Sequence, residues 1–239
     1  MMNAPRMILF DYGQTLLCEQ GFDGVAGTKA VLLYATKNKY NHMAEEIQAA
    51  ANEINREVGR GNPKTRHQFQ IEVPNPMLTA YLYQSMGIEL SLTSSQIDRV
   101  FWDAASPAVP TEGIEEFLLY LKARQIRTGV ISNISYCAKV VQERICRMLP
   151  CNDFEFILTS SEYMFRKPHA RIFQLALEKA GLQPEEVWYI GDDYQCDVVV
   201  ARNAGIFPVY YIGASKKEPM EDVLTVSTWE ELEAYLENQ

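Results

Sequence analysis

Five short runs of apolar residues recur along the chain, and glycine, proline or polar residues bound each of them. The runs are MILF (7–10), TGVISN (128–133), FEFILTS (154–160), VWYIGD (187–192) and FPVYYIG (207–213). Apolar runs of about four to eight residues between turn residues are typical of buried β-strands. The hydrophobic pattern therefore predicts a sheet that is covered on both faces.

Amphipathic helical patterns separate these strands. Residues 113–124 place their apolar side chains on one helical face, and residues 171–181 repeat the pattern up to Gly181, a usual helix C-cap. Residues 197–204 give a further short helix. Alternation of strand and helix predicts an α/β fold, a Rossmann-like doubly wound parallel sheet whose ligands bind at the carboxyl ends of the strands.

Residues 17–105, called the insertion below, interrupt this alternation. They hold no strand-like run, and their helical patterns cover 25–37, 43–58, 77–86 and 94–104. TSSQ at 93–96 is a capping sequence for the last of these helices. We expect an all-helical cap domain at 17–105 that lies over the carboxyl edge of the sheet, and a core domain formed by residues 1–16 and 106–239.

Composition narrows the classes of function. The chain has 239 residues, a net charge of -9 and scattered basic residues, which argues against nucleic-acid binding. It has no apolar run of membrane length, so we expect no membrane partner. Five cysteines without a CxxC pair, and no signal peptide, predict a reduced, cytoplasmic protein. Nothing in the sequence indicates the oligomeric state.

Polar residues stand where the predicted strands end. Asp11 follows the first strand, Ser132 and Asn133 end the second, and Asp192 ends the fourth, while Lys167 lies in the loop after the third. The carboxyl ends of parallel strands meet at one edge of a sheet. We therefore expect these side chains to converge on one site.

These residues resemble a known set of motifs. DYGQT at 11–15, Ser132-Asn133, Lys167 in RKPHARIF and GDDYQCD at 191–197 are similar, in order and spacing, to the four motifs of the haloacid dehalogenase-like hydrolase superfamily. The insertion resembles the cap of the subgroup that includes phosphoglycolate phosphatase, phosphonatase and the dehalogenases. The resemblance implies a Mg²⁺-dependent phosphohydrolase that acts on a small phosphorylated metabolite.

The resemblance also implies a role for each acidic residue. Asp11 would be the nucleophile that forms an aspartyl-phosphate. Asp11, the backbone carbonyl of Gly13 and Asp192 would hold the metal, with Asp193 or Asp197 binding it through water or orienting its shell. Hard oxygen ligands and phosphate chemistry favour Mg²⁺.

The remaining motif residues would bind the phosphoryl group. By the same resemblance, Lys167 neutralises Asp11 and the transferring group, since an anionic nucleophile must approach an anionic phosphate. Ser132 and the backbone N–H of Asn133 would donate hydrogen bonds to phosphoryl oxygens. Thr15 would orient Asp11 and help to govern movement of the cap.

Gly13 departs from the pattern of the family's phosphatases. They carry a second aspartate at this place, which protonates the leaving oxygen and then activates water; such catalysis is typically worth ~10²- to 10⁴-fold. Ordinary phosphate esters should therefore react slowly here unless the substrate has a good leaving group, as in an acyl phosphate or phosphoanhydride, or another group supplies the proton. His67, Glu72 and Tyr12 are the candidates for that group.

Three other members of the superfamily remain as alternatives. A phosphonatase-like C–P hydrolase also lacks the second aspartate, but it needs a cap lysine for a Schiff base; the candidates here are Lys29, Lys37, Lys39 and Lys64. A dehalogenase carries an aromatic residue at the place of Gly13. A catalytically weak member would only bind a phosphorylated ligand or a protein partner.

The charged motif residues favour an enzyme over this last alternative, because a converging charged cluster is costly to maintain without use. Residues 59–76 are where we expect substrate contacts. Their candidate side chains are Arg60, Lys64, Arg66 and His67.

Overall fold

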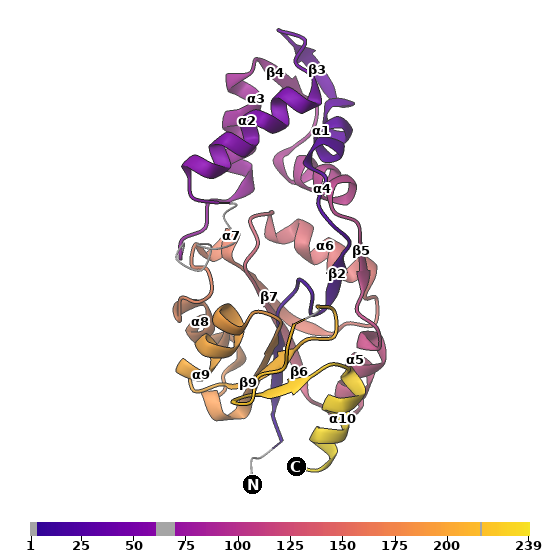
Figure 1. Ribbon diagram of the computed structural model, residues 1–239, viewed down its shortest axis with the longest axis vertical. Helices are drawn as coiled ribbons and strands as arrows, with labels where there is room; N and C mark the ends of the chain where they lie inside the picture. Colours follow the sequence, from indigo (N-terminus) through magenta and orange to yellow (C-terminus); the bar gives the residue numbers. More distant parts are fainter. Residues whose placement is uncertain (1–3, 61–69, 216) are drawn as a thin grey trace.

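A six-stranded parallel sheet forms the lower part of the molecule (Figure 1). The computed structural model describes residues 4–60, 70–215 and 217–239. The strand order is β10-β9-β8-β1-β6-β7, and every neighbouring pair is parallel. The strands are β1 (Met7–Phe10), β6 (Arg127–Ser132), β7 (Phe154–Thr159), β8 (Val187–Gly191), β9 (Phe207–Tyr211) and β10 (Leu224–Val226). The five predicted strands are confirmed, and β10 adds an edge strand.

Helices cover both faces of this sheet, as the sequence predicts. The side chains of β1 alternate between two apolar clusters, so that Ile8 and Phe10 belong to one cluster while Met7 and Leu9 belong to the other. The first cluster includes side chains of α5 (Ile114–Ala123), α6 (Ala138–Met148) and α10 (Trp229–Glu237). The second includes side chains of α8 (Arg171–Ala180) and α9 (Val200–Asn203). Burial on both faces explains why β1 is apolar at every position.

The helix predicted at 197–204 begins earlier than expected. A π-helical turn, η3 (Tyr194–Val199), precedes α9. The Asp193 carboxylate accepts hydrogen bonds from the N–H groups of Gln195 and Cys196, at 3.0 and 2.9 Å. This cap starts the helical backbone directly after the fourth predicted strand. The short helices α7 (Ser160–Tyr163) and η2 (Pro184–Glu186) complete the core.

The insertion leaves and rejoins the core through a two-stranded ribbon. β2 (Leu17–Glu19) pairs antiparallel with β5 (Ala108–Pro110). Above this ribbon, the upper part of the molecule holds α1 (Gly24–Leu32), α2 (Ala44–Glu57), α3 (Asn75–Ser85) and α4 (Ser94–Ala105) (Figure 1). The capping box predicted at 93–96 is confirmed, with Thr93 and Gln96 as its members. These helices share an apolar cluster of their own, which includes Val31, Ile47 and Leu82.

Besides β2, two further short strands of the insertion differ from the all-helical expectation. β3 (Ala35–Asn38) pairs antiparallel with β4 (Ile88–Leu90). The first helix of the insertion therefore ends at Leu32, and residues predicted to continue it form a strand instead. The hydrophobic pattern did not indicate this pair because each strand is only three or four residues long and its partner is far away in the sequence.

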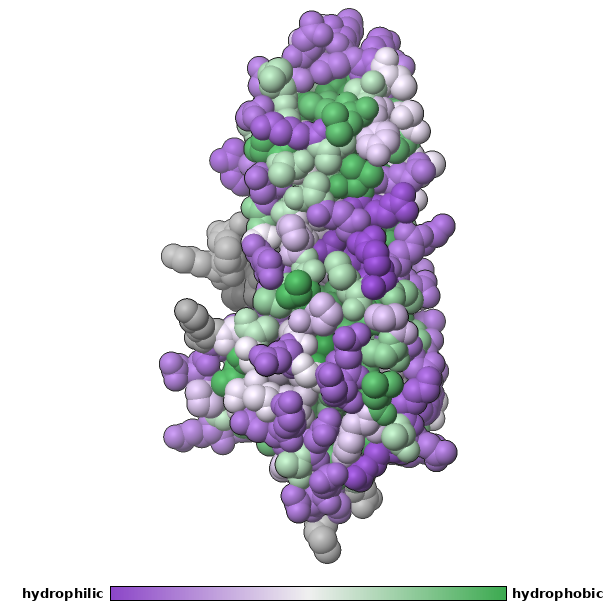
Figure 2. Space-filling model, turned by 90° about the vertical axis from the view of Figure 1, so that its right-hand side faces the viewer, coloured by the Kyte–Doolittle hydropathy of each residue, from purple (hydrophilic) through white to green (hydrophobic). Residues whose placement is uncertain are grey.

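Large apolar side chains are exposed on the surface of the insertion. Figure 2 shows apolar groups exposed on the upper part of the molecule, above a more hydrophilic band. Leu33, Tyr40, Met43, Met77 and Tyr81 are among the exposed large apolar side chains of this part. Among the described helices, none combines the length and the hydropathy that crossing a membrane requires.

Candidate active site

A cavity of about 370 Å³ lies at the carboxyl ends of the central strands. Its walls include Asp11, Ser132, Lys167 and Asp192, one residue from each of the segments expected to converge. The segments meet because β1 lies between β6 and β8, with all three strands running in the same direction. The predicted convergence is confirmed.

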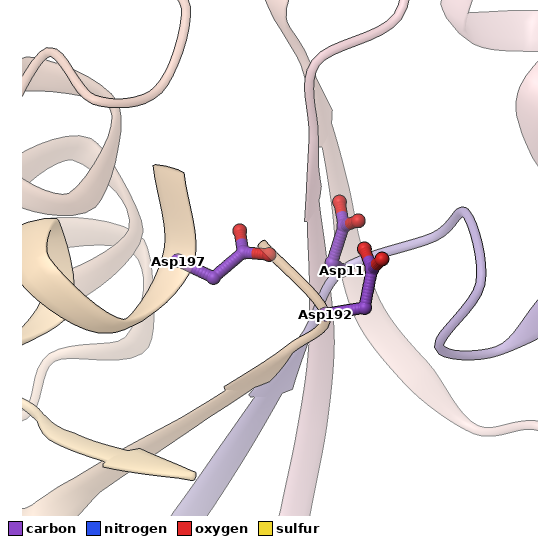
Figure 3. Close-up of side chains that lie close together, drawn as sticks. All are labelled: Asp11, Asp192 and Asp197. Carbon is purple, nitrogen blue, oxygen red and sulfur yellow. The ribbon is translucent and has the colours of Figure 1, made fainter. Parts of the chain in front are cut away.

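Asp11 is held at the floor of this cavity by the sheet itself. Its N–H donates to the carbonyl of Ile190 on β8, at 2.8 Å, so the β1 pairing continues one residue beyond the strand. The carboxylate oxygens of Asp11, Asp192 and Asp197 come within 4.8 Å of one another. Figure 3 shows the Asp11 and Asp192 side chains side by side, with Asp197 turned toward them from η3. The strand end therefore aims one carboxylate into an acidic cluster.

The ammonium of Lys167 is the central cation of this cluster. Its Nζ donates to Asp11 Oδ1 at 2.7 Å, to Asp197 Oδ1 at 2.6 Å and to the Tyr189 hydroxyl at 2.6 Å. The side chain is 2% exposed. Burial lowers the pKa of Lys167, but the attraction of the two carboxylates outweighs it and the net pKa is raised. Lys167 is thus a charged group fixed against Asp11.

The backbone around Lys167 is held by Asn133. The Lys167 N–H donates to Asn133 Oδ1, and Asn133 Nδ2 donates to the Lys167 carbonyl, both at 2.7 Å. The peptide bond between Lys167 and Pro168 is cis. The side chain of Asn133 therefore positions the lysine loop.

Ser132 and Thr15 have different surroundings. Ser132 ends β6, is buried and lines the cavity beside Asp11. Thr15 is fully buried, its hydroxyl has no hydrogen-bond partner among the described residues, and it is not among the residues that line the cavity. The structure shows no hydrogen bond between Thr15 and Asp11, so the expected role of Thr15 in orienting Asp11 has no direct contact behind it and stays a prediction. The turn after Asp11, closed by the Leu16 N–H to the Tyr12 carbonyl at 3.0 Å, directs Thr15 into the interior.

The three aspartates of the last motif make different contacts. Asp192 lines the cavity and pairs with Lys217. Asp193 caps η3, as described above. Asp197 is buried, with Oδ1 engaged by Lys167 and by the Tyr189 hydroxyl (3.2 Å) and Oδ2 by the N–H of Asp193 (2.8 Å). Both Asp197 oxygens therefore already have donors, which suits a residue that positions Lys167.

The cluster has the chemistry of a site for a hard divalent cation. Asp11 and Asp192 offer carboxylate oxygens, and the carbonyl-bearing Gly13 lines the same cavity. Burial, together with repulsion from Asp197, raises the pKa values of Asp11 and Asp192 despite their lysine partners. A divalent cation would stabilise their ionised forms. Oxygen ligands of this kind suit Mg²⁺.

Aromatic residues that the motifs did not indicate form another wall. Trp102 of α4 lines the cavity and stacks on Tyr136, with ring centroids 4.4 Å apart. Arg144 lies over the Trp102 ring at 4.4 Å. Tyr189 was also missed, although a tyrosine in a buried strand needs a partner for its hydroxyl. Trp102, Tyr136 and Arg144 come from segments that are far apart in the sequence, so no local pattern could indicate that they lie together.

The groups suggested to replace the missing aspartate are poorly suited to it. The Tyr12 hydroxyl accepts from Arg144 Nε at 2.9 Å, and burial raises the pKa of Tyr12 above its ordinary value. Glu72 pairs with Arg166, accepts from the Ser160 hydroxyl and is not among the residues that line the cavity. His67 lies outside the described residues.

The lysines that a phosphonatase-like reaction would use lie elsewhere. Lys29 pairs with Glu45 at 2.9 Å and Lys37 with Glu89 at 2.7 Å, all with exposed side chains. Lys39 lies over the ring of Tyr40. None of these three lysines lines the cavity, while Lys64 and Arg66 lie outside the described residues.

Comparisons with known proteins agree with this geometry. Residues 5–205 match the sequence model of the haloacid dehalogenase-like hydrolases. The chain is 26% identical over 227 residues to the Bos taurus haloacid dehalogenase-like hydrolase domain-containing protein 3. The aligned region covers 90% of this chain and 84% of that protein. It is also 36% identical over 89 residues to a glyceraldehyde 3-phosphate phosphatase of Methanothermobacter thermautotrophicus. That aligned region covers 37% of this chain and 38% of the phosphatase.

The fold of the chain is also similar to that of a solved structure. A 2-haloacid dehalogenase from Pseudomonas syringae pv. tomato superimposes with a TM-score of 0.64 at 17% identity, over 97% of this chain and 98% of that one. At this identity the likeness describes the fold and not the reaction.

Proposed function

Since the chain belongs to the haloacid dehalogenase-like hydrolase family, we propose that this hydrolase is a phosphatase that acts on a small phosphorylated metabolite through an aspartyl-phosphate on Asp11. The observation that carries the proposal is the pairing of Asp11 with a buried lysine inside the cavity. Lys167 can cancel charge on both the nucleophile and the incoming phosphate, which is what phosphoryl transfer demands of a protein.

The residues around Asp11 divide the work of the reaction. An Asp11 carboxylate oxygen attacks phosphorus, and the bond to the leaving oxygen breaks. Ser132 and the backbone N–H of Asn133 bind the phosphoryl oxygens, while Asp197 and Tyr189 keep the Lys167 ammonium in place. Mg²⁺, held by Asp11, Asp192 and the Gly13 carbonyl, would supply positive charge to the transferring group when bound.

We also propose that the insertion acts as a cap. Trp102 belongs to α4 of the insertion and lines the cavity, so closure against the core would exclude water from the reacting groups. Arg166 lines the cavity too, and Arg60, a member of the segment expected to contact substrate, has one buried guanidinium nitrogen without a hydrogen-bond partner among the described residues. These cationic groups favour a substrate that carries a further anionic or strongly polar group.

The proposal is tested with three substrates, each with Mg²⁺ and with excess chelator. We expect Mg²⁺-dependent release of phosphate from an aryl phosphate and from acetyl phosphate, and no reaction of phosphonoacetaldehyde. Asp11→Asn should abolish turnover, whereas Asp222→Asn, an acid exposed on the surface and paired with Arg202, should leave it unchanged. Reaction of phosphonoacetaldehyde alone would favour the C–P hydrolase. Unchanged rates in Asp11→Asn would refute the nucleophile.

A further inference from the structure

Gly13, where the family's phosphatases carry their second aspartate, borders open space in the cavity. A Cβ atom built on Gly13 has no other group within 4 Å, and the backbone of Gly13 is not in the left-handed region. Gly13 and Glu19 line the same cavity. Glu19 ends β2, and the side-chain amide of Gln14 donates to its carbonyl at 3.4 Å. A carboxylate from outside the four motifs thus lines the cavity, on the strand that follows the Asp11 loop.

The Glu19 carboxylate is fixed by the aromatic wall. Trp102 Nε1 donates to Glu19 Oε1 at 2.9 Å. Trp102 is only 2% exposed and is itself held by Tyr136 and Arg144. A carboxylate anchored to a buried ring has little freedom to turn away, so its position is defined before substrate binds.

Glu19 differs from the other acids of the cavity. Asp11, Asp192 and Asp197 each accept a hydrogen bond from a lysine, and Asp193 caps a helix. Glu19 has a neutral indole donor instead. Burial raises the pKa of Glu19, while hydrogen bonding with Trp102 and Ser106 and the attraction of Arg144 oppose that shift. A carboxyl group that gives up its proton less readily is better suited to donate it near neutral pH.

We propose that Glu19 is the general acid and base of this enzyme, placed on the ribbon between core and insertion where Gly13 provides no carboxylate. The inference rests on the proposed phosphatase function. This role would also couple the insertion to the chemistry, because Trp102 of the insertion donates a hydrogen bond to the proton carrier.

Glu19 donates one proton and regains one proton in each turnover. Asp11 attacks phosphorus, the bond between phosphorus and the leaving oxygen breaks, and that oxygen takes the proton of the Glu19 carboxyl group to leave as the alcohol. A water molecule then attacks the phosphorus of the aspartyl-phosphate and gives one proton to the Glu19 carboxylate. Asp11 leaves with its bonding electron pair, inorganic phosphate is released and Glu19 is protonated again.

The test is Glu19→Gln, which keeps an acceptor for Trp102 and removes the proton. With an aryl phosphate, whose leaving group needs no acid, we expect a burst of one equivalent of phenolate followed by a steady state slower by about 10²-fold. With a primary alkyl phosphate, the first turnover itself should slow by about 10²-fold. A melting temperature close to that of the unchanged protein is the control for folding.

A second variant separates proton transfer from structure. Adding Gly13→Asp to Glu19→Gln supplies a carboxylate from the empty place, and we expect it to recover at least tenfold of the lost rate on the alkyl phosphate. Failure to recover would assign the loss to something other than a proton carrier and overturn the inference. So would a Glu19→Gln enzyme with unchanged rates on both substrates.

The same assays keep the two proposals apart. If the unaltered protein hydrolyses the aryl phosphate through Asp11 while Glu19→Gln has no effect, the role of Glu19 is wrong and the phosphatase function stands. If the unaltered protein hydrolyses neither ester, the proposed function fails and the role of Glu19 fails with it.

Discussion

At the scale of single residues, the site depends on how one buried cation is shared. Lys167 contacts two carboxylates and a tyrosine hydroxyl at 2.6–2.7 Å. A buried ion pair is only modestly stabilising as a whole, but removing one partner leaves uncompensated charge in the interior. The contacts that hold Lys167 against Asp11 are therefore also structural.

Replacing Lys167 by methionine should affect activity and stability together. We expect hydrolysis of an aryl phosphate to fall by more than about 10²-fold and the free energy of unfolding in urea to fall by roughly 3–5 kcal/mol. Lys217→Met is the matched control, because Lys217 also pairs with an acid of the cluster but is 37% exposed. It should cost less than about 1 kcal/mol. Equal losses for the two variants would contradict the account.

Much of this site could be predicted from the sequence, and the limits are physical. Asp11, Ser132, Lys167 and Asp192 follow from where apolar strands end, since parallel strands bring their ends together. The surroundings of Thr15 could not be predicted, because the path of a tight turn directs its hydroxyl into the interior. Glu19 was missed because its significance comes from Trp102, which is 83 residues away in the chain.

At the scale of elements, one arginine joins the insertion to the core. Arg144 on α6 donates to Asp103 on α4 at 2.8 Å, to the Tyr12 hydroxyl at 2.9 Å and to the carbonyl of Ser106. It is 2% exposed and also lies over Trp102. The packing of α4 against α6 thus fixes the aromatic wall of the cavity.

Arg144→Met should therefore destabilise the protein more than a matched change on the same helix. Arg147 also pairs with Asp103, at 2.6 Å, but its side chain is 46% exposed. We expect roughly 3 kcal/mol of lost unfolding free energy for Arg144→Met, because it leaves buried polar groups without partners. Arg147→Met should cost less than about 1 kcal/mol. Chemical denaturation of both variants measures the difference, and a larger loss for Arg147→Met would refute it.

The elements themselves were predictable where their patterns are long or apolar. All five predicted strands occur, since a strand buried on both faces has a continuous apolar sequence. The β3–β4 pair was not predicted because two short strands are stabilised by each other rather than by local pattern. The π-helical start at Tyr194 depends on the capping carboxylate of Asp193, which the sequence also allowed to be a metal-site residue.

At the scale of the whole molecule, the cavity lies where insertion and core meet. Asp11 and Asp192 come from the core, while Trp102 comes from the insertion, so a ligand bound among them stabilises the folded arrangement of both parts. A cation that binds only the folded chain raises its stability by mass action.

Magnesium should therefore protect the protein against heat without any substrate present. At a concentration of about a hundred times its dissociation constant, Mg²⁺ adds about 2.7 kcal/mol, which we expect to raise the melting temperature by several degrees. Asp192→Asn should lose most of this rise, while Asp222→Asn should retain it. Scanning calorimetry with Mg²⁺ and with chelator provides the measurement. An equal rise in both variants would place the cation elsewhere.

In the proposed mechanism, Asp11 carries the phosphoryl group during turnover. The most direct test of this role is to quench the enzyme during aryl phosphate hydrolysis, reduce it with borohydride and locate the modified residue by peptide mass spectrometry. Reduction of an aspartyl-phosphate gives homoserine. We predict homoserine at position 11, and none when substrate is omitted. Active turnover with an unmodified Asp11, or homoserine at another aspartate, would contradict the account.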